Sequence, residues 1–472
     1  MSKPPNINAL LELIESKKVK RSIEFLQVRR DRILPHENID DLIFSADEGD
    51  ASWLSGIEYH LEYVVGAIHK GLWSNGIFIG TSVLVDLVFA ALREDTDAPI
   101  RQVLRTIRDS GIHQPGIVVY PLHSFGILGA GFLTYFTGAD AEMAVPEAGL
   151  SLRAQTNDLA RTIAFLQSSA QLLCSGKRLS RDQIEHYSGS RPTQWLTHNP
   201  LLIAKVRSFS GTYYENQSFL ILRLTLATAF LFMLAALQER FHPSKVATFG
   251  STLRVNNWQT LDIKHYLLFE PRPGKSSFLE GRCVPMNVKR AELAELSALN
   301  VEVHPRAWRQ RHLLSKKLCA SLETVERGYL RYSLGRKKHT NHGRVYRKLY
   351  DALSYFRASF RRTGNPGEQI VNLAIAFEVL LTDFYGEGVM GRLSRRLRLA
   401  LGKVPQKSSL SDSLECLYKA RNEIVHQGMT EDDPDLSVAR AAFVHAFLGV
   451  ADKLDEIPED SNEPIREMLG DR

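Results

Sequence analysis

Apolar residues recur at intervals of three and four along most of this chain, which is the spacing of helices with one buried face. This pattern predicts helices over residues 98–109, 152–176, 219–240, 368–384 and 410–428. Two other apolar stretches are β-branched or alternating and are bounded by turn residues, which predicts strands at residues 115–120 and 257–273. We therefore expect a mainly α protein with some β strands.

The length of 472 residues exceeds the size that one hydrophobic core usually supports. We expect a large α-rich region with some strands, a basic connection, a helical bundle and a frayed acidic tail, over residues 1–300, 301–340, 341–457 and 458–472 respectively. No fixed-period repeat or long low-complexity tract interrupts this division.

Several signals of particular protein classes are missing from the sequence. The cysteines lack C-x-x-C spacing, which argues against a disulfide framework or a zinc site and fits a reducing cytoplasm; they are Cys174, Cys283, Cys319 and Cys416. Walker A, G-x-S-x-G and H-E-x-x-H sequences are also missing, which argues against an ATPase, a serine hydrolase or a zinc protease. We expect no metal and no cofactor.

The most apolar stretch, residues 219–237, is interrupted by Arg223, Thr225 and Thr228. Its uninterrupted part is shorter than the roughly 20 residues that a membrane-spanning helix needs. The N-terminus has no apolar core or cleavage site of a secretory signal. We expect a buried helix at this stretch, no contact with a membrane, and a cytoplasmic protein.

Charge is unevenly distributed along the chain, although the formal net charge is only +6. Residues 301–410 contain about 22 Lys and Arg against about 8 Asp and Glu, whereas residues 411–472 contain about 6 against about 15. A basic block suits the binding of a phosphate backbone, although basic helix faces are often only solvated. The candidate RNA-binding residues of this block are Lys337, Lys338, Arg392, Arg395, Arg396 and Arg398.

The helix predicted over residues 410–428 carries a charge on its buried face. Its apolar stripe of Leu410, Leu414 and Leu417 continues by one turn to Arg421. A buried guanidinium requires an anionic partner or a ligand. Ser409 or Ser411 is expected to cap the start of this helix, and Gly428 is expected to end it.

His426 follows Arg421 by five residues, a rotation of about 500°, so the two side chains point roughly 140° apart on one helix. Asn422 and His426, four residues apart, share a face. One helix therefore cannot easily close Arg421 and His426 around a single phosphate. Two copies of the chain, packed through this region, can do so.

The string RNEIVH that begins at Arg421 has the form R-polar-x-x-x-H. Upstream of it lie the helical stretches VYRKLYDALSYFRASF and EQIVNLAIAFEVLLTDF, and the string is followed by Gln-Gly. On these features, residues 341–457 resemble HEPN domains of the Apea-like subgroup. The resemblance covers about the last quarter of the chain, and residues 1–300 show none.

HEPN domains of this kind are commonly metal-independent endoribonucleases that act as dimers. The resemblance implies that His426 is the general base and acid in a transesterification through the RNA 2′-hydroxyl, a role that suits an imidazole of ordinary pKa near 6.5. Arg421 would stabilise charge on the phosphoryl oxygens, and Asn422 would position the phosphate or the imidazole. It also implies an effector of a bacterial toxin or antiphage defence system, in which residues 1–300 sense a phage-derived or cellular trigger.

Glu378 lies on an otherwise apolar face of the helix predicted over residues 368–384 and is the obvious partner for Arg421. It either has a functional role, in which it orients Arg421 or lies by the scissile phosphate, or forms a purely structural ion pair with Arg421. The main alternative for the chain is a non-catalytic HEPN module that binds RNA, a nucleotide or a protein partner. A helical scaffold with a buried Glu378–Arg421 pair is a third reading.

Overall fold

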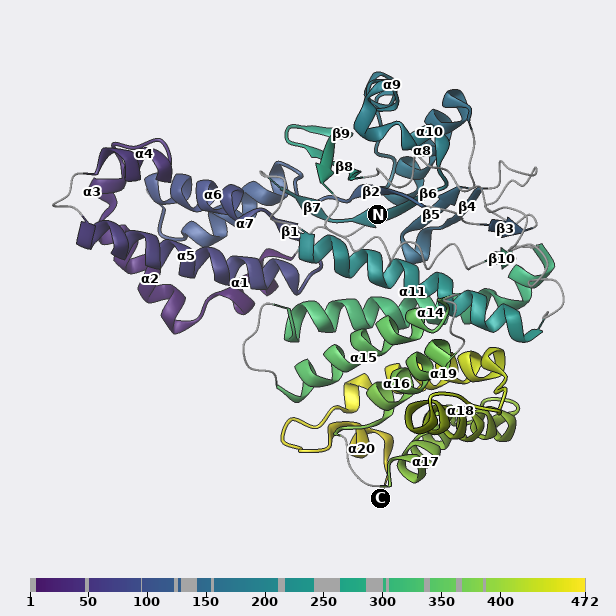
Figure 1. The fold of residues 1–472 in the computed structure, drawn as a ribbon. Coiled ribbons are helices and arrows are strands. Elements are labelled where there is room, and N and C mark those ends of the chain that lie inside the picture. The colour runs from purple at the N-terminus through teal and green to yellow at the C-terminus, as the bar shows by residue number, and fades with distance from the viewer. Residues whose placement is uncertain are drawn as a thin grey trace.

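The structure is a computed structural model that describes residues 6–46, 51–94, 96–122, 126–128, 142–153, 157–210, 217–241, 264–285, 300–302, 305–334, 340–361, 367–384 and 388–471. Within these residues the protein is mainly helical with a smaller β component, as the sequence predicts (Figure 1).

The N-terminal helices form a bundle at one side of the molecule (Figure 1). They are α1 (Ile7–Ile14), α2 (Lys17–Val28), α3 (Arg30–Ile33), α4 (Ile39–Ser45), α5 (Ala51–Trp73), α6 (Thr81–Arg93) and α7 (Pro99–Asp109). Their apolar faces close on a core of their own, in which Val64, Ile68 and Leu104 are buried. The helix predicted over residues 98–109 is α7, which begins at a proline whose fixed φ suits the first helical position.

A six-stranded antiparallel sheet follows in the order β4-β5-β6-β2-β8-β9. Its strands are β2 (Gly116–Pro121), β4 (Glu142–Val145), β5 (Leu150–Arg153), β6 (Leu201–Val206), β8 (His265–Arg272) and β9 (Lys275–Pro285). Short parallel pairs join β1 (Phe78–Ile79) to β7 (Ser208–Phe209), and β3 (Gly126–Leu128) to β10 (Asn300–Glu302). The predicted strands correspond to β2 and β8, and residues 257–263 lie outside the described part.

Each face of the sheet packs against helices, so both faces are buried. Alternate residues of β2 enter different cores: Ile117 and Val119 pack with α8 (Leu159–Leu173), whereas Val118 and Tyr120 pack with α11 (Gln217–Phe241). The short helices α9 (Arg181–Gly189) and α10 (Trp195–His198) complete the α8 side (Figure 1). The helix expected over residues 152–176 starts late, at Leu159, because Leu150–Arg153 pairs with the sheet as β5.

Helix α11 carries apolar side chains around most of its circumference, because other elements cover it from two sides. One stretch of it, Phe219–Leu237, is long and apolar enough to cross a membrane by length and composition, and 89% of that stretch is buried inside the protein. The sheet covers one side of α11, and the C-terminal helices cover the other (Figure 1). The burial predicted for this helix is confirmed.

The C-terminal helices are α14 (Pro305–Tyr332), α15 (Asn341–Ala358), α16 (Gly367–Leu381), α17 (Val389–Leu401), α18 (Lys407–Gln427), α19 (Leu436–Ala451) and α20 (Pro464–Leu469). The expected basic connection is mostly helix α14, and its buried Leu318, Leu322 and Val325 belong to the same core as α11, α15 and α19. One continuous apolar core therefore runs from the sheet through α11 and α14 into the bundle.

The expectation of a frayed acidic tail is wrong. Helix α20 buries Ile465, Met468 and Leu469 in the bundle core, beside α15 and α17. These apolar side chains recur at helical spacing between the acidic residues, which makes burial of this short helix favourable.

Candidate functional site

Helix α18 carries the R-polar-x-x-x-H string, and Leu410, Leu414 and Leu417 are fully buried along its inner face as predicted. It starts at Lys407, earlier than expected, and neither predicted serine caps it. Instead Ser411 donates a hydrogen bond to the Lys407 carbonyl, 2.9 Å away. The predicted terminus is confirmed, because Gly428 adopts φ +79°, a left-handed conformation that glycine accepts without strain.

Arg421 and Glu378 meet between α18 and α16, as the sequence predicts. The Arg421 Nη2 atom lies 3.7 Å from Glu378 Oε1, and the two side chains are only 22% and 17% exposed. The Tyr418 hydroxyl donates a hydrogen bond to the same carboxylate oxygen, and the Arg421 guanidinium carbon lies 5.7 Å from the Tyr418 ring centroid. The three side chains form one half-buried cluster.

Burial dominates the electrostatics of this cluster. It raises the pKa of Glu378 above the ordinary value for a carboxyl, and the positive charge of Arg421 opposes that rise. The Arg421 Nε atom is buried and has no hydrogen-bond partner among the described residues. The Arg421 side chain is 22% exposed, so part of a guanidinium that a carboxylate orients remains open to an oxyanion.

Asn422 adjoins the cluster, whereas His426 does not. The Arg421 Nη1 atom donates to Asn422 Oδ1 at 3.1 Å, and Asn422 is exposed. His426 is exposed on the last turn, and no hydrogen bond or ion pair joins it to Glu378 or Arg421 within the described structure. The exposed apolar side chains of Val425 and Met429, 52% and 65% exposed, lie beside it in the chain.

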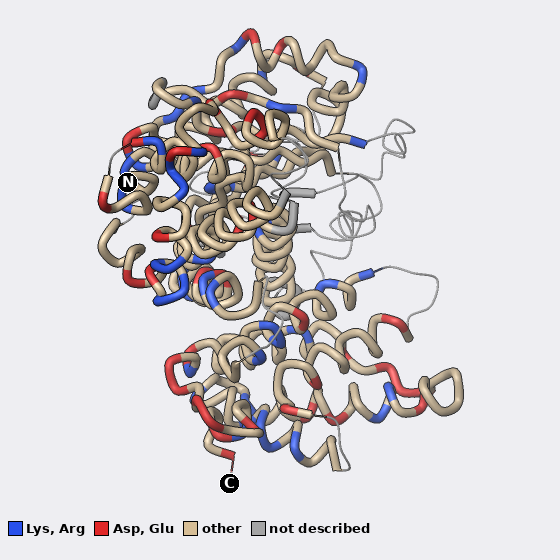
Figure 2. Tube along the Cα trace, turned by 90° about the vertical axis from the view of Figure 1, so that its left-hand side faces the viewer, with Lys and Arg blue, Asp and Glu red and all other residues tan. Residues whose placement is uncertain are grey.

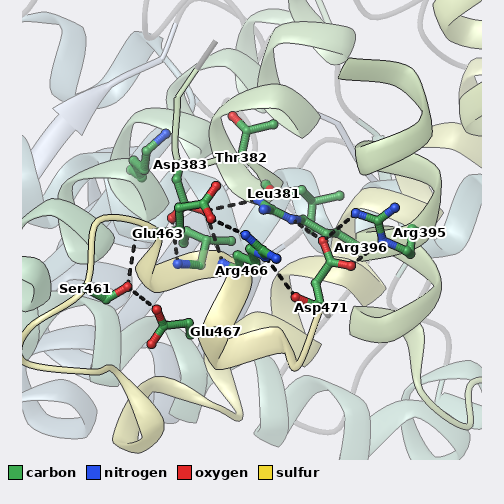
Figure 3. A network of polar contacts seen from close by, with 12 residues as sticks. Leu381, Thr382, Asp383, Arg395, Arg396, Ser461, Glu463, Arg466, Glu467 and Asp471 are labelled. Carbon is green, nitrogen blue, oxygen red and sulfur yellow. Dashed lines mark hydrogen bonds and ion pairs between the residues drawn. The ribbon is translucent and has the colours of Figure 1, made fainter. Parts of the chain in front are cut away.

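The structure contradicts RNA binding by Arg396. This residue is 2% exposed, and its guanidinium donates to Asp471 at 2.9 Å, to Asp383 at 3.0 Å and to the Leu381 carbonyl at 2.9 Å (Figure 3). Asp383 also accepts hydrogen bonds from backbone amides at the start of α20, those of Ile465 and Arg466. Arg396 therefore fastens α20 to the bundle, and it cannot reach a phosphate backbone.

The other basic candidates differ in what they contact. Arg395 is exposed but its guanidinium pairs with the buried Asp471, and Arg398 lies 3.6 Å from Glu415. The Arg392 guanidinium lies 5.7 Å from the Phe384 ring centroid. Lys337 and Lys338 lie outside the described residues. Figure 2 shows acidic and basic residues interspersed over the C-terminal helices, so the basic block of the sequence is not a single basic face.

Sequence reasoning missed Tyr418 and the anchoring pair Asp383 and Asp471. Tyr418 has a recognisable signal, because it lies three residues before Arg421 and its hydroxyl requires a partner when buried. The two aspartates have no local signal, because their shared partner Arg396 lies 13 residues from Asp383 and 75 residues from Asp471, too far for contact within one helix.

In the part of the chain that the structure describes, no group of three or more His, Cys, Asp or Glu side chains is arranged to hold a metal ion. Comparison with known proteins finds no matching family model, no similar curated protein and no similar solved structure. The function is therefore inferred from the residues of the site.

Proposed function

We propose that the protein is a metal-independent endoribonuclease of the HEPN type, which cuts RNA by 2′-hydroxyl transesterification and acts as a cytoplasmic homodimer. The observation that carries this proposal is the half-buried cluster of Glu378, Tyr418 and Arg421 on the helix that presents an exposed His426. The resemblance of residues 341–457 to Apea-like HEPN domains supports the same activity.

The imidazole of His426 removes the proton from the ribose 2′-hydroxyl. The 2′-oxygen then forms a bond to phosphorus, the bond from phosphorus to the 5′-oxygen breaks, and a protonated His426 of either protomer gives a proton to that leaving oxygen. The products are a 2′,3′-cyclic phosphate and a 5′-hydroxyl end. DNA lacks the attacking hydroxyl, so it is not cleaved.

Arg421 stabilises the negative charge that develops on the phosphoryl oxygens. Its guanidinium is held beside Glu378, and the exposed part of the side chain donates to the phosphate. Glu378 acts through Arg421 and is a positioning residue, since the Tyr418 hydroxyl fixes its carboxylate. Asn422, bonded to Arg421 and on the helix face of His426, positions the phosphate or the imidazole.

A second copy of the chain completes this site in the proposal. Arg421 and His426 diverge on α18, and the exposed Val425 lies between them in the sequence. Packing two α18 helices through this apolar position brings His426 of each protomer toward the Arg421 cluster of the other.

Such an enzyme suits a bacterial toxin or antiphage effector, with residues 1–300 responding to a phage-derived or cellular trigger.

The decisive experiment incubates purified full-length protein with total cellular RNA in EDTA and analyses the new RNA ends. The wild type is expected to leave 2′,3′-cyclic phosphate and 5′-hydroxyl ends, and His426→Ala is expected to lose at least about 100-fold in rate because it removes the general base. Gln427→Ala, at the adjacent exposed position, is the matched control and is expected to retain activity.

Undiminished cleavage by a folded His426→Ala variant would contradict the proposed mechanism. RNA binding without cleavage by the wild type instead favours the non-catalytic HEPN module. Overexpression separates the same two functions in cells, because growth arrest by a nuclease depends on both Arg421 and His426.

A further inference from the structure

A cavity of about 940 Å³ lies where three parts of the chain meet, away from the Arg421 cluster. The turn after α5 closes one side, and the turn before β5 and the end of β6 form another. Helices α11 and α14, the start of α15 and residues 454–455 form the rest. Its volume is near the upper end of the range of about 300–1,000 Å³ that is typical of small-molecule sites.

Two cations that line this cavity make no direct ion pair in the described part of the chain. Lys205 on β6 and Arg207 directly after it are both half-buried. Neither side chain has an ion pair or hydrogen bond among the described residues. A third cation, Arg223, is already neutralised, because its Nη1 atom lies 2.9 Å from Glu326 Oε2 and its Nε atom donates to the Lys205 carbonyl.

The remaining carboxylates of the cavity are on its outside. Glu147, Glu323 and Asp455 line it, but all three are exposed to solvent. Buried charges without counter-ions are costly, so two neighbouring half-buried cations require a reason to be there. Burial lowers the pKa of Lys205, and Arg207 lowers it further, which means that the two groups repel each other. Burial likewise lowers the pKa of Arg207, and the negative charges of Glu323 and Glu326 only partly oppose that shift.

We propose that this cavity binds a phosphorylated small molecule, with the phosphate against Lys205 and Arg207. A phosphate accepts charge-assisted hydrogen bonds from both side chains and removes their mutual repulsion. The cavity is far larger than a free phosphate ion, so the remainder accommodates the organic part of the ligand. This site is separate from the nuclease proposal, and its test does not depend on RNA cleavage.

The test is isothermal titration calorimetry of the full-length protein with inorganic phosphate, pyrophosphate, ATP and adenosine at up to millimolar concentration. At least one phosphate-bearing probe is expected to bind, and the same probe is expected to raise the melting temperature of the protein in a thermal denaturation measurement. Uncharged adenosine is expected to do neither. Tighter binding of ATP than of pyrophosphate identifies an organic ligand, and equal binding identifies a free phosphate or polyphosphate as the source.

Arg207→Gln and Lys205→Gln are each expected to weaken binding of that probe by about tenfold or more, because each removes one charged donor. Arg101→Gln, at an exposed position of α7, is the matched control and is expected to bind normally. Lys205→Arg keeps the charge and is expected to retain most of the affinity, which separates lost recognition from lost folding. Failure of every phosphate-bearing probe to bind, or equal binding by folded Arg207→Gln and Lys205→Gln variants, overturns the proposal.

Discussion

A carboxylate and a guanidinium share one half-buried position between α16 and α18, and neither is fully solvated. Burial favours the neutral form of Glu378, whereas Arg421 favours its charged form. The raised Glu378 pKa means that burial is the larger of the two effects. Arg421 therefore offsets part of the free-energy cost of burying the charged Glu378 carboxylate, a cost that applies mainly at pH values above the ordinary pKa of a glutamate.

Replacing Arg421 by alanine is expected to destabilise the protein in a pH-dependent way. Without Arg421 the Glu378 pKa of the folded state rises further, so stability falls more steeply as pH increases from the unfolded-state pKa of about 4.3 through the folded-state pKa. We expect a cost of about 1 kcal/mol near pH 7 and a smaller cost near pH 4. Urea denaturation at both pH values measures it.

Arg421→Lys keeps the positive charge and is the control for that measurement. It should show a smaller pH dependence than Arg421→Ala. Equal destabilisation by Arg421→Ala at the two pH values would mean that the residue acts through packing and not through the charge of Glu378.

The Glu378–Arg421 contact could be predicted because each residue interrupts an apolar stripe, and the period of a helix identifies such a position. The divergence of Arg421 from His426 could be predicted from the same period. The exposure of His426 could not, because burial of a terminal helical turn depends on which neighbouring elements reach it. The Tyr418 contact with Glu378 depends in the same way on how α16 packs against α18.

At the scale of elements, α20 is held to α17 by polar contacts that the sequence places far apart. Asp471 accepts hydrogen bonds from Arg395 and Arg396, and Asp383 bonds both Arg396 and the start of α20 (Figure 3). Composition alone suggested a solvated tail, because acidic residues outnumber apolar ones there. The prediction that Arg396 binds RNA was wrong for the same reason, since its acidic partners are close to it only in the fold.

Asp471→Asn is expected to lower the free energy of unfolding by about 2 kcal/mol, because it leaves the buried Arg396 with one carboxylate fewer. The hydrogen bond from Arg395 is the largest cause of the lowered Asp471 pKa. The stabilisation is therefore present above the unfolded-state pKa of an aspartate and is lost as pH falls through the lowered pKa.

Asp460→Asn, an exposed position in the same acidic segment, is the matched control and should leave stability within about 0.5 kcal/mol. Chemical denaturation of the three proteins at neutral pH decides the matter. A chemical denaturation curve for Asp471→Asn that matches the wild type would show that α20 is held by its apolar side chains alone.

At the scale of the whole molecule, the proposed nuclease requires two chains to meet at α18. Val425→Arg is expected to convert a dimer to monomers and to abolish RNA cleavage without changing the unfolding free energy of the monomer, because Val425 is 52% exposed within one chain. Sedimentation velocity measures the oligomer, and the EDTA assay measures cleavage.

Val28→Arg, at a 79% exposed valine of the N-terminal bundle, is the control for charge and should keep both properties. Full cleavage by a monomeric Val425→Arg protein would place the whole active site within one protomer.

The class of the molecule, mainly helical with a minority of strands, could be predicted from periodicity, and so could the burial of α11. The sharing of one core by the sheet, α11, α14 and the C-terminal helices could not be predicted in this way. Residue patterns show that a helix has no polar face, but they do not identify the elements that cover it. Here Phe232 of α11 packs against Phe360 at a ring-centroid distance of 5.0 Å, and Thr225 of α11 lies 3.3 Å from the Tyr350 hydroxyl.

The continuous core through α11 and α14 has a practical consequence for dissecting this protein. Expression from residue 341 onward would remove the apolar surface that α11 and α14 provide, including the Tyr332 and Tyr329 rings that pack on Tyr346 and Tyr350 of α15. The C-terminal helices are thus not an excisable cassette, and their chemistry is best studied by point substitution within the intact polypeptide.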